Sequence, residues 1–177
     1  MSVETLNAAI GIATAALQIL SVAFLVVYLC RARLPDLAGV VEFVGRQGLR
    51  IAFALVFGAF AMSLYYSEVL GFTPCGLCWV QRIFMYSQLV LLGVALWKNE
   101  TRIADYSIAL SVCGAIVALY NHYLQMGGNA VIPCPASGGG DCAQRFFFEL
   151  GYITFPLLGF TIFASLIILM LFVRRSR

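Results

Sequence analysis

Long apolar segments separated by short polar stretches set the pattern of this chain. Five of them approach the ~20 residues that an α-helix needs to cross a bilayer, and they cover residues 6–30, 51–72, 77–97, 103–126 and 152–173. None alternates apolar and polar residues as barrel strands do, and a helix satisfies its own backbone hydrogen bonds in lipid. The pattern therefore predicts an all-α integral membrane protein with five transmembrane helices.

Composition supports this class. Hydrophobic residues make up 62% of the 177 residues and charged residues only 11%, whereas roughly 25% of the residues of a soluble domain are charged. No soluble core could bury so much apolar surface. The net charge of +3 is therefore no indication of nucleic-acid binding.

Basic residues gather in alternate connections between the apolar segments. Such connections stay in the cytoplasm, so we expect a cytoplasmic C-terminus, with the N-terminus, the turn around residue 75 and the loop 127–151 outside. The first segment has no basic residue before it and arginines directly after it, which indicates a retained anchor rather than a signal peptide. Nine of the eleven Lys and Arg follow this distribution, namely Arg31, Arg33, Arg46, Arg50, Lys98, Arg102, Arg174, Arg175 and Arg177.

Two cysteines lie where the second and third apolar segments meet. Pro74 disfavours a helix just before it and the apolar run resumes at residue 77, so Cys78 is predicted in the first turn of a helix and Cys75 just before that helix. The positive end of the helix dipole favours a thiolate there. Arg82 follows Cys78 by four residues, which predicts a guanidinium near the Cys78 sulfur or near an oxygen of a bound ligand. The alternative for Arg82 is an interaction with lipid headgroups.

The outer loop holds a second cysteine pair. Cys134 and Cys142 are separated by seven residues that include three consecutive glycines, and such a flexible segment can close or open a disulfide with little strain. His122, near the outer end of the fourth segment, is a secondary candidate because it is the only histidine. Cys30 and Cys113 lie within apolar segments, and we assign them no role.

Three interpretations of the four outer cysteines compete. A four-cysteine zinc site would require two closely spaced pairs, which the second pair does not provide. Two purely structural disulfides suit an exported face but leave Arg82 unexplained. A redox relay fits best, because one disulfide lies in a loop that a soluble partner can reach and the other lies at a membrane able to hold a lipid-soluble electron acceptor.

In combination, these motifs resemble the disulfide bond formation protein B (DsbB) family. The resemblance covers about residues 51–175, and it implies a bacterial cytoplasmic-membrane enzyme, a protein dithiol:quinone oxidoreductase. Residues 1–50 would then form an additional N-terminal transmembrane helix with a connector, and residues 51–177 a four-helix redox domain. The matching stretches are Cys75-Gly-Leu-Cys78 with Arg82, Tyr120-Asn-His122-Tyr-Leu-Gln125, Gly140-Asp141-Cys142-Ala143-Gln-Arg, Leu150-Gly151 and Pro156-Leu-Leu-Gly159.

The resemblance also implies a mechanism. A soluble thioredoxin-fold dithiol oxidase (DsbA-like) would attack a disulfide between Cys134 and Cys142 and form a mixed disulfide at Cys134. Cys142 would attack Cys75 and release Cys78 as a thiolate beside Arg82 and a quinone, either ubiquinone or menaquinone. Arg82 and His122 are the candidate quinone-binding residues, and no metal is expected.

The chain differs from the long-loop members of this family. Only seven residues separate the loop cysteines, as in shorter relatives of Gram-positive bacteria. The first helix has no counterpart in the family core, and Gln81 stands where some members have an acidic residue. A vitamin K epoxide reductase-like oxidoreductase is the nearest alternative, but that group places its loop pair before the membrane pair. A non-enzymatic membrane protein with structural disulfides would instead have cysteines inert to exchange.

Overall fold

A computed structural model describes residues 2–31, 37–132, 134 and 141–176. Within these residues, five helices are long and apolar enough to cross a membrane, which confirms the predicted all-α integral membrane class. The remaining elements are short: a π-helix η2, a 3-10 helix η3 and an antiparallel pair of two-residue strands. In chain order the elements are α1 (Val3–Cys30), α2 (Ala38–Leu64), η2 (Tyr65–Val69), α3 (Gly76–Lys98), η3 (Thr101–Ile103), α4 (Ala104–Gln125), β1 (Phe148–Glu149), β2 (Ile153–Thr154) and α5 (Phe155–Arg175).

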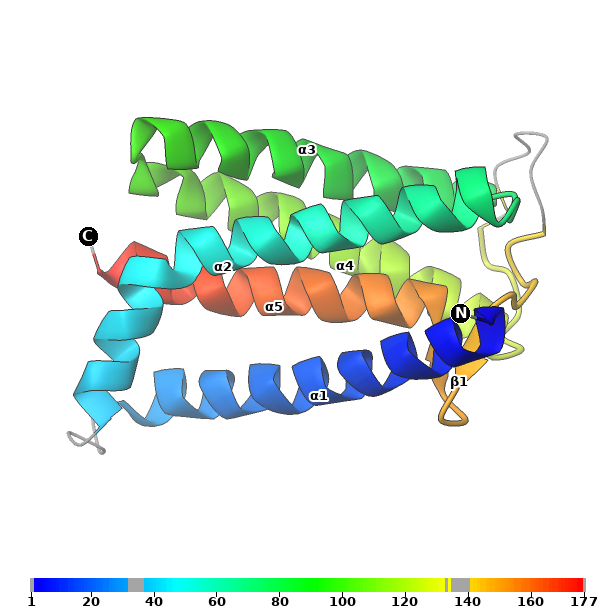
Figure 1. Ribbon diagram of the computed structural model, residues 1–177, viewed down its shortest axis with the longest axis horizontal. Coiled ribbons are helices and arrows are strands. Elements are labelled where there is room, and N and C mark those ends of the chain that lie inside the picture. Colours follow the sequence, from blue (N-terminus) through cyan, green and yellow to red (C-terminus); the bar gives the residue numbers. More distant parts are fainter. Residues whose placement is uncertain (1, 32–36, 133, 135–140, 177) are drawn as a thin grey trace.

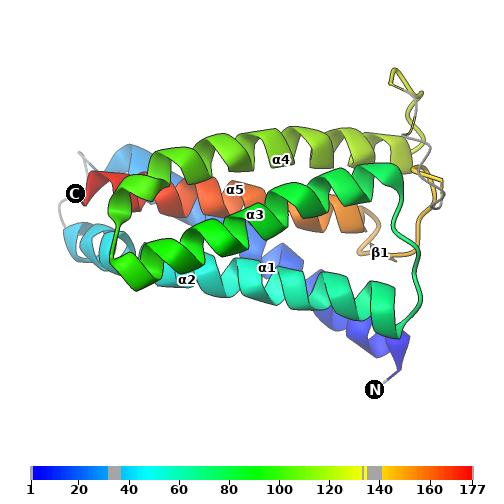
Figure 2. The same ribbon diagram turned by 90° about the horizontal axis from the view of Figure 1, so that it is seen from above.

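Helix α5 is the central element of the bundle. It packs against α1, α2 and α4, and Figures 1 and 2 show it running along all three. Two thirds of its apolar window is buried, against a third or less for each other helix. Phe163, Leu166 and Met170 are fully buried and form the core together with Val56 and Leu92. The N-terminal end of α5 lies at the same end of the bundle as the start of α3 (Figure 1).

Helix α2 begins earlier than the sequence indicated. It starts at Ala38 and continues past residue 50 to Leu64 without interruption. Its first turns bend away from the rest (Figure 1). Gly45 and Gly48, which by residue type could interrupt a helix, are contact positions within it. A Cβ at Gly48 would lie 2.7 Å from Val173 Cγ2, so the missing side chain lets α2 approach the end of α5. Arg33 and Pro35 lie outside the described residues.

The two ends of the bundle differ in chemistry. The first turns of α2 and the last turns of α3 and α5 share one end, whereas the N-terminus, the start of α3 and the β1–β2 hairpin share the other (Figure 1). Arg46, Lys98 and Arg174 belong to the first group of segments, and Arg174 pairs with Asp105 at 3.3 Å. Most basic residues of the described segments are thus separated from the paired cysteines along the bundle, as the charge pattern predicted.

Candidate active site

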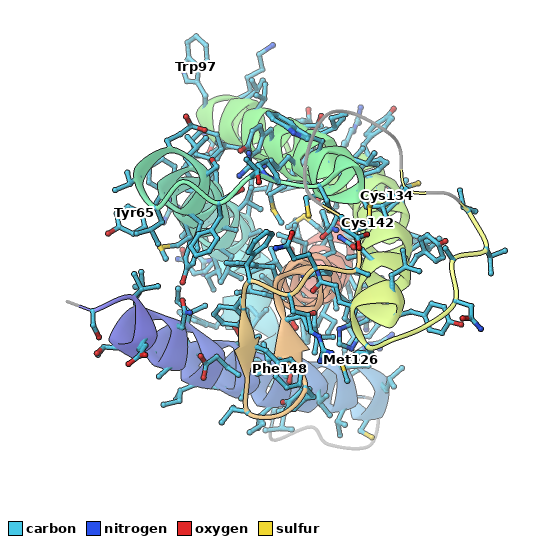
Figure 3. All side chains as sticks on the ribbon, turned by 90° about the vertical axis from the view of Figure 1, so that its right-hand side faces the viewer. Tyr65, Trp97, Met126, Cys134, Cys142 and Phe148 are labelled. Atoms are coloured by element: carbon cyan, nitrogen blue, oxygen red, sulfur yellow. A yellow bond between two sulfur atoms is a disulfide. The ribbon has the colours of Figure 1, made fainter. Side chains whose placement is uncertain are left out.

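All four predicted redox cysteines meet in one small apolar cluster. Cys75 and Cys142 are 3% and 1% exposed, and Cys78 and Cys134 pack against them. Figure 3 shows Cys134 and Cys142 side by side near the end of α4. Leu77 and Leu124 complete the buried part of the cluster. Two cysteine pairs that are far apart in the chain therefore share one environment from which most water is excluded.

The start of α3 positions the first pair. Cys75 is the N-cap in extended conformation, and its sulfur accepts the backbone N–H of Cys78 at 3.3 Å. Cys78 lies in the first turn, as predicted. The two sulfur atoms are 2.6 Å apart, well inside the separation of unbonded sulfurs and close to the about 2.05 Å of a disulfide. The pair is thus placed to close a disulfide with little movement.

The loop pair is joined in the structure by a disulfide between Cys134 and Cys142, the pairing that the family resemblance implied. Tyr120 of α4 holds the chain two residues before Cys134. Its hydroxyl donates to the Ile132 carbonyl at 2.7 Å and accepts the Ile132 N–H at 2.8 Å. Residues 135–140, which contain the consecutive glycines, lie outside the described part of the chain, so their flexibility stays a prediction.

Asn121 is the site residue that sequence reasoning missed. Its side chain is fully buried, and its amide Nδ2 lies 3.8 Å from the Cys75 sulfur and 3.6 Å from the Cys78 sulfur. Its Oδ1 is buried with no hydrogen-bond partner among the described residues. The only sequence signal was its place in the Tyr120-Asn-His122 motif, where an uncharged amide is less conspicuous than the neighbouring titratable histidine.

The environment of the first pair favours a thiolate in its reduced form. Cys75 precedes the membrane-spanning part of α3. The hydrogen bond from the Cys78 thiol, with the N–H groups of Cys78 and Leu77 and the Asn121 amide, lowers the pKa of Cys75 to about 6, although burial opposes this. These contacts therefore favour a thiolate on Cys75 in the fully reduced pair, a state distinct from the Cys78 thiolate predicted for the step in which Cys75 is bonded to Cys142.

His122 points elsewhere. Its Nδ1 lies 2.8 Å from Thr154 Oγ1, and Thr154 caps the start of α5. Successive residues of an α-helix are turned by about 100°, so Asn121 and His122 cannot face the same neighbour. His122 is also absent from the residues that line the cavity described next. The structure therefore gives no geometric support to His122 as a ligand-binding residue.

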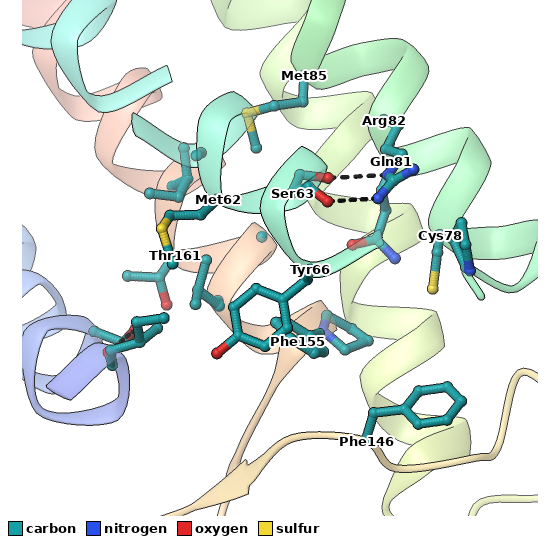
Figure 4. Close-up of a pocket in the computed structure, with 18 of the residues that line it drawn as sticks. Met62, Ser63, Tyr66, Cys78, Gln81, Arg82, Met85, Phe146, Phe155 and Thr161 are labelled. Atoms are coloured by element: carbon teal, nitrogen blue, oxygen red, sulfur yellow. Dashed lines mark hydrogen bonds between the residues drawn. The ribbon is translucent and has the colours of Figure 1, made fainter. Parts of the chain in front are cut away.

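A cavity of about 410 Å³ opens beside the first cysteine pair. Its lining is mostly apolar and comes from α1, α2, α3, α5 and the loops between them, with Cys75 and Cys78 in its wall. The volume lies within the roughly 300–1,000 Å³ of small-molecule sites. Its polar lining groups include Ser63, Gln81 and Arg82 (Figure 4). Others come from the segments next to the cysteines: Thr73, Gln125, Asp141 and Gln144.

Arg82 lines this cavity but bonds to a different partner than predicted. Its Nε donates to Ser63 Oγ at 2.9 Å and its Nη2 to the Ser63 carbonyl at 2.8 Å (Figure 4). The guanidinium also lies 5.2 Å from the centre of the Trp79 ring. Ser63 is close to η2, and π-turns are frequent at functional sites. Arg82 and Cys78 thus line the same cavity, but the guanidinium hydrogen-bonds to Ser63 and not to the Cys78 sulfur.

Gln81 adds a second polar group to the cavity. Its Nε2 is buried and has no hydrogen-bond partner among the described residues, while its Oε1 lies so close to Gly159 that a Cβ there would be at 2.9 Å. An unpaired buried amide costs about 1–3 kcal/mol. A ligand with an acceptor oxygen in the cavity would remove that cost.

Comparison with known proteins agrees with the site. Residues 45–173 match the family model described as "Disulfide bond formation protein DsbB". Disulfide bond formation protein C of Bacillus subtilis is 37% identical over 61% of this chain and 78% of its own length. The probable disulfide formation protein C of Halalkalibacterium halodurans is 34% identical over 65% of this chain and 84% of its own length. No solved structure matches the chain significantly.

The fold and the clustered cysteines define the class of the protein: a membrane protein that carries out disulfide exchange. The family match covers well over half of the chain, so the protein belongs to the DsbB family. It is accordingly a multi-pass membrane disulfide-forming oxidoreductase.

Proposed function

We propose that this protein oxidises a soluble, extracytoplasmic thioredoxin-fold dithiol oxidase and passes the electrons to a membrane quinone. The observation that carries the proposal is the meeting of two cysteine pairs beside an apolar cavity that has Cys75 and Cys78 in its wall. One pair, Cys134 with Cys142, lies in a loop, and the other lies at the start of a membrane helix. Such an arrangement suits the transfer of electrons from a partner in water to an acceptor in the lipid.

The thiol steps follow from this arrangement. A thiolate of the partner attacks Cys134, which breaks the Cys134–Cys142 disulfide and leaves Cys142 as a thiolate. Cys142 attacks Cys75 of the oxidised first pair and releases Cys78 as a thiolate. The second thiolate of the partner then breaks the mixed disulfide, so the partner is oxidised and Cys134 is freed. Cys134 attacks Cys142, restores the loop disulfide and leaves Cys75 and Cys78 as the reduced pair.

The residues of this chain stabilise the charges that these steps create. The Asn121 amide lies 3.6 Å from the Cys78 sulfur, so it is placed to stabilise the Cys78 thiolate that would form when Cys75 is bonded to Cys142. Hydrogen bonds to a thiolate in a buried site are stronger than those in water. Burial of Cys75 and Cys142 also limits competing reactions with water or small thiols.

The cavity fits a quinone. Its apolar lining suits the ring and tail, and the orphaned Gln81 Nε2 and the Arg82 guanidinium offer donors for the two ring oxygens. Arg82 has five N–H groups, and the bonds to Ser63 use two of them. A bound quinone would accept two electrons from the reduced Cys75–Cys78 pair, together with two protons drawn from the pair and from water, and would leave as the quinol while that disulfide reforms.

The proposal places the cysteines and the N-terminus outside the cytoplasmic membrane of a bacterium and the C-terminus inside. Support comes from the distribution of basic residues, since Arg46, Arg50, Lys98, Arg102 and Arg174 all belong to segments at the end of the bundle opposite the cysteines. Loops rich in Lys and Arg remain cytoplasmic. Disulfides also persist on the outer side, where the compartment is oxidising.

Reconstitution tests the proposal. The protein in lipid vesicles with quinone and a reduced thioredoxin-fold oxidase should reduce quinone continuously. Cys78→Ser should lower this rate at least 100-fold, and Cys113→Ser, at an exposed free cysteine of α4, should leave it unchanged. Equal rates for Cys78→Ser and the wild type would disprove the relay. Cysteines that do not exchange with the reduced partner would instead favour purely structural disulfides.

A further inference from the structure

The N-terminal helix α1 lies outside the family match, which begins at residue 45, yet it lines the cavity. Ile10, Ala13, Thr14 and Leu17 contribute to its wall. These residues recur at the spacing of one helical face. The sequence alone assigned this helix no role, because nothing in it indicated a cavity shared with helices that lie further along the chain.

Polar contacts fix α1 on α5. Gln18 Nε2 donates to Thr161 Oγ1 at 3.0 Å, and the hydroxyls of Ser21 and Ser165 are 2.8 Å apart. The Tyr152 hydroxyl donates to Gln18 Oε1 at 2.9 Å. Between helices in lipid, such hydrogen bonds and small residues are what holds the elements together. The register of α1 is therefore set, and its cavity-lining face is presented in a defined way.

The outer end of α1 is held as well. The Tyr66 hydroxyl donates to Asn7 Oδ1, which ties α1 to η2 beside the cavity. Gly11 packs against the β1–β2 hairpin, because a Cβ at this position would lie 2.8 Å from Glu149 Cβ. The helix is thus anchored on both the α5 side and the loop side.

The side of α1 that faces α2 is different. Helix α1 packs along α5 but makes no extensive contact with α2 within the described residues, and both helices line the cavity. The α2 side carries small residues there, among them Ala54, Gly58 and Ala59. A Cβ added at Gly58 would meet nothing within 4 Å. The space between α1 and α2 is therefore part of the cavity, and small residues line it on the α2 side.

We propose that α1 is a wall of the ligand site and that the isoprenoid tail of the quinone lies between α1 and α2, over Ala13 and Gly58. This inference rests on the proposed quinone function. The charged and amide groups of the cavity come from α3, the end of α4 and the loop beside Cys142, and they suit the ring: Gln81, Arg82, Gln125, Asp141 and Gln144. In α1 and this part of α2 the lining is almost only apolar, with Thr14 as the exception. From Ile10 to Leu17 the α1 wall extends about 10 Å along the helix, which suits an extended chain rather than a second ring.

Filling the space from either wall tests the inference. Ala13→Phe and Gly58→Leu should each raise the KM for a quinone with an isoprenoid tail at least five-fold. The KM for a tail-less quinone should change less than two-fold, because the ring end of the cavity is untouched. Ala8→Phe is the matched control: Ala8 is exposed on the same helix and does not line the cavity. It should behave as the wild type with both quinones.

A second readout separates this inference from the proposed function. The single-turnover exchange between the reduced partner and the Cys134–Cys142 disulfide, measured without quinone, should be unchanged in all three variants, which also shows that they fold. If the wild type turns over quinone but Ala13→Phe and Gly58→Leu match Ala8→Phe, the tail does not lie there and only the inference fails. If the wild type reduces no quinone at all, both the inference and the proposed function fail.

Discussion

Replacing Asn121 by leucine should raise the pKa of Cys75. Leucine has a similar size, so the change removes the amide donor while keeping the volume of the buried site. A hydrogen bond to a charged group contributes about 1.5–3 kcal/mol, and the contacts from Asn121 are long, at 3.8 Å and 3.6 Å to the two sulfurs. A loss near the lower end, about 1.4 kcal/mol, raises the pKa by roughly one pH unit.

The same loss changes the redox balance of the pair. Above its pKa of about 6, the Cys75 thiolate stabilises the reduced state, and this stabilisation disappears as the pH falls below that value. With the pKa raised by roughly one pH unit, the reduced state at pH 7 loses about 1 kcal/mol. For a two-electron couple this lowers the reduction potential of the Cys75–Cys78 pair by about 20 mV. The variant pair is therefore a weaker oxidant.

Alkylation kinetics measure the effect. With Cys30, Cys113, Cys134 and Cys142 replaced by serine, only the first pair reacts with iodoacetamide after reduction, and its rate rises with pH as the thiolate forms. The midpoint should lie near pH 6 with Asn121 present and about one pH unit higher in Asn121→Leu.

A control variant separates this effect from general loosening of the bundle. Gln88 is equally buried and hydrogen-bonded to Ser107 and Ser111. Gln88→Leu should therefore lower stability and leave the alkylation midpoint in place. An Asn121→Leu midpoint equal to that of the unsubstituted pair would refute the assignment of the amide as a thiolate donor.

Three further substitutions test other parts of the structure. Arg82→Ala should raise the KM for quinone about ten-fold in steady-state kinetics of quinone reduction and leave thiol exchange with the partner unchanged. An unchanged KM would instead favour the alternative that Arg82 interacts with lipid headgroups. Tyr120→Phe removes both hydrogen bonds to Ile132, so amide hydrogen exchange at Ile132 should accelerate at least ten-fold, and protection equal to the wild type would contradict the anchoring. Gly48→Val should lower the free energy of unfolding in detergent by at least 2 kcal/mol through overpacking against Val173, and a stable variant would show that the helices can separate there without cost.

The sequence predicted well those features that depend on local chemistry. Pro74 and the resuming apolar run placed Cys75 before α3 and Cys78 in its first turn, and the structure has both there. The helices were predictable because each apolar span carries its own signal. The start of α2 was not, because Gly45 and Gly48 look like breakers until the end of α5 is seen packed against them.

Contacts between segments that are distant in the chain could not be predicted from the sequence. That Arg82 would bond to Ser63 depends on how closely α2 and α3 pack, and that Asn121 rather than His122 would face the cysteines depends on the rotation of α4 about its axis. The role of α1 required the cavity itself. In each case the residue types were visible, but the partner was set by packing.

The transfer of electrons between the two cysteine pairs is the central claim, and the stoichiometry of partner oxidation tests it most directly. With excess quinone and excess reduced partner, the wild type should oxidise many partner molecules per protein. A Cys75→Ser/Cys78→Ser variant retains the loop disulfide between Cys134 and Cys142, so it should oxidise no more than one partner molecule per protein and then stop. Continued turnover by this variant would contradict the relay, because electrons would then leave the loop pair without passing through the membrane pair.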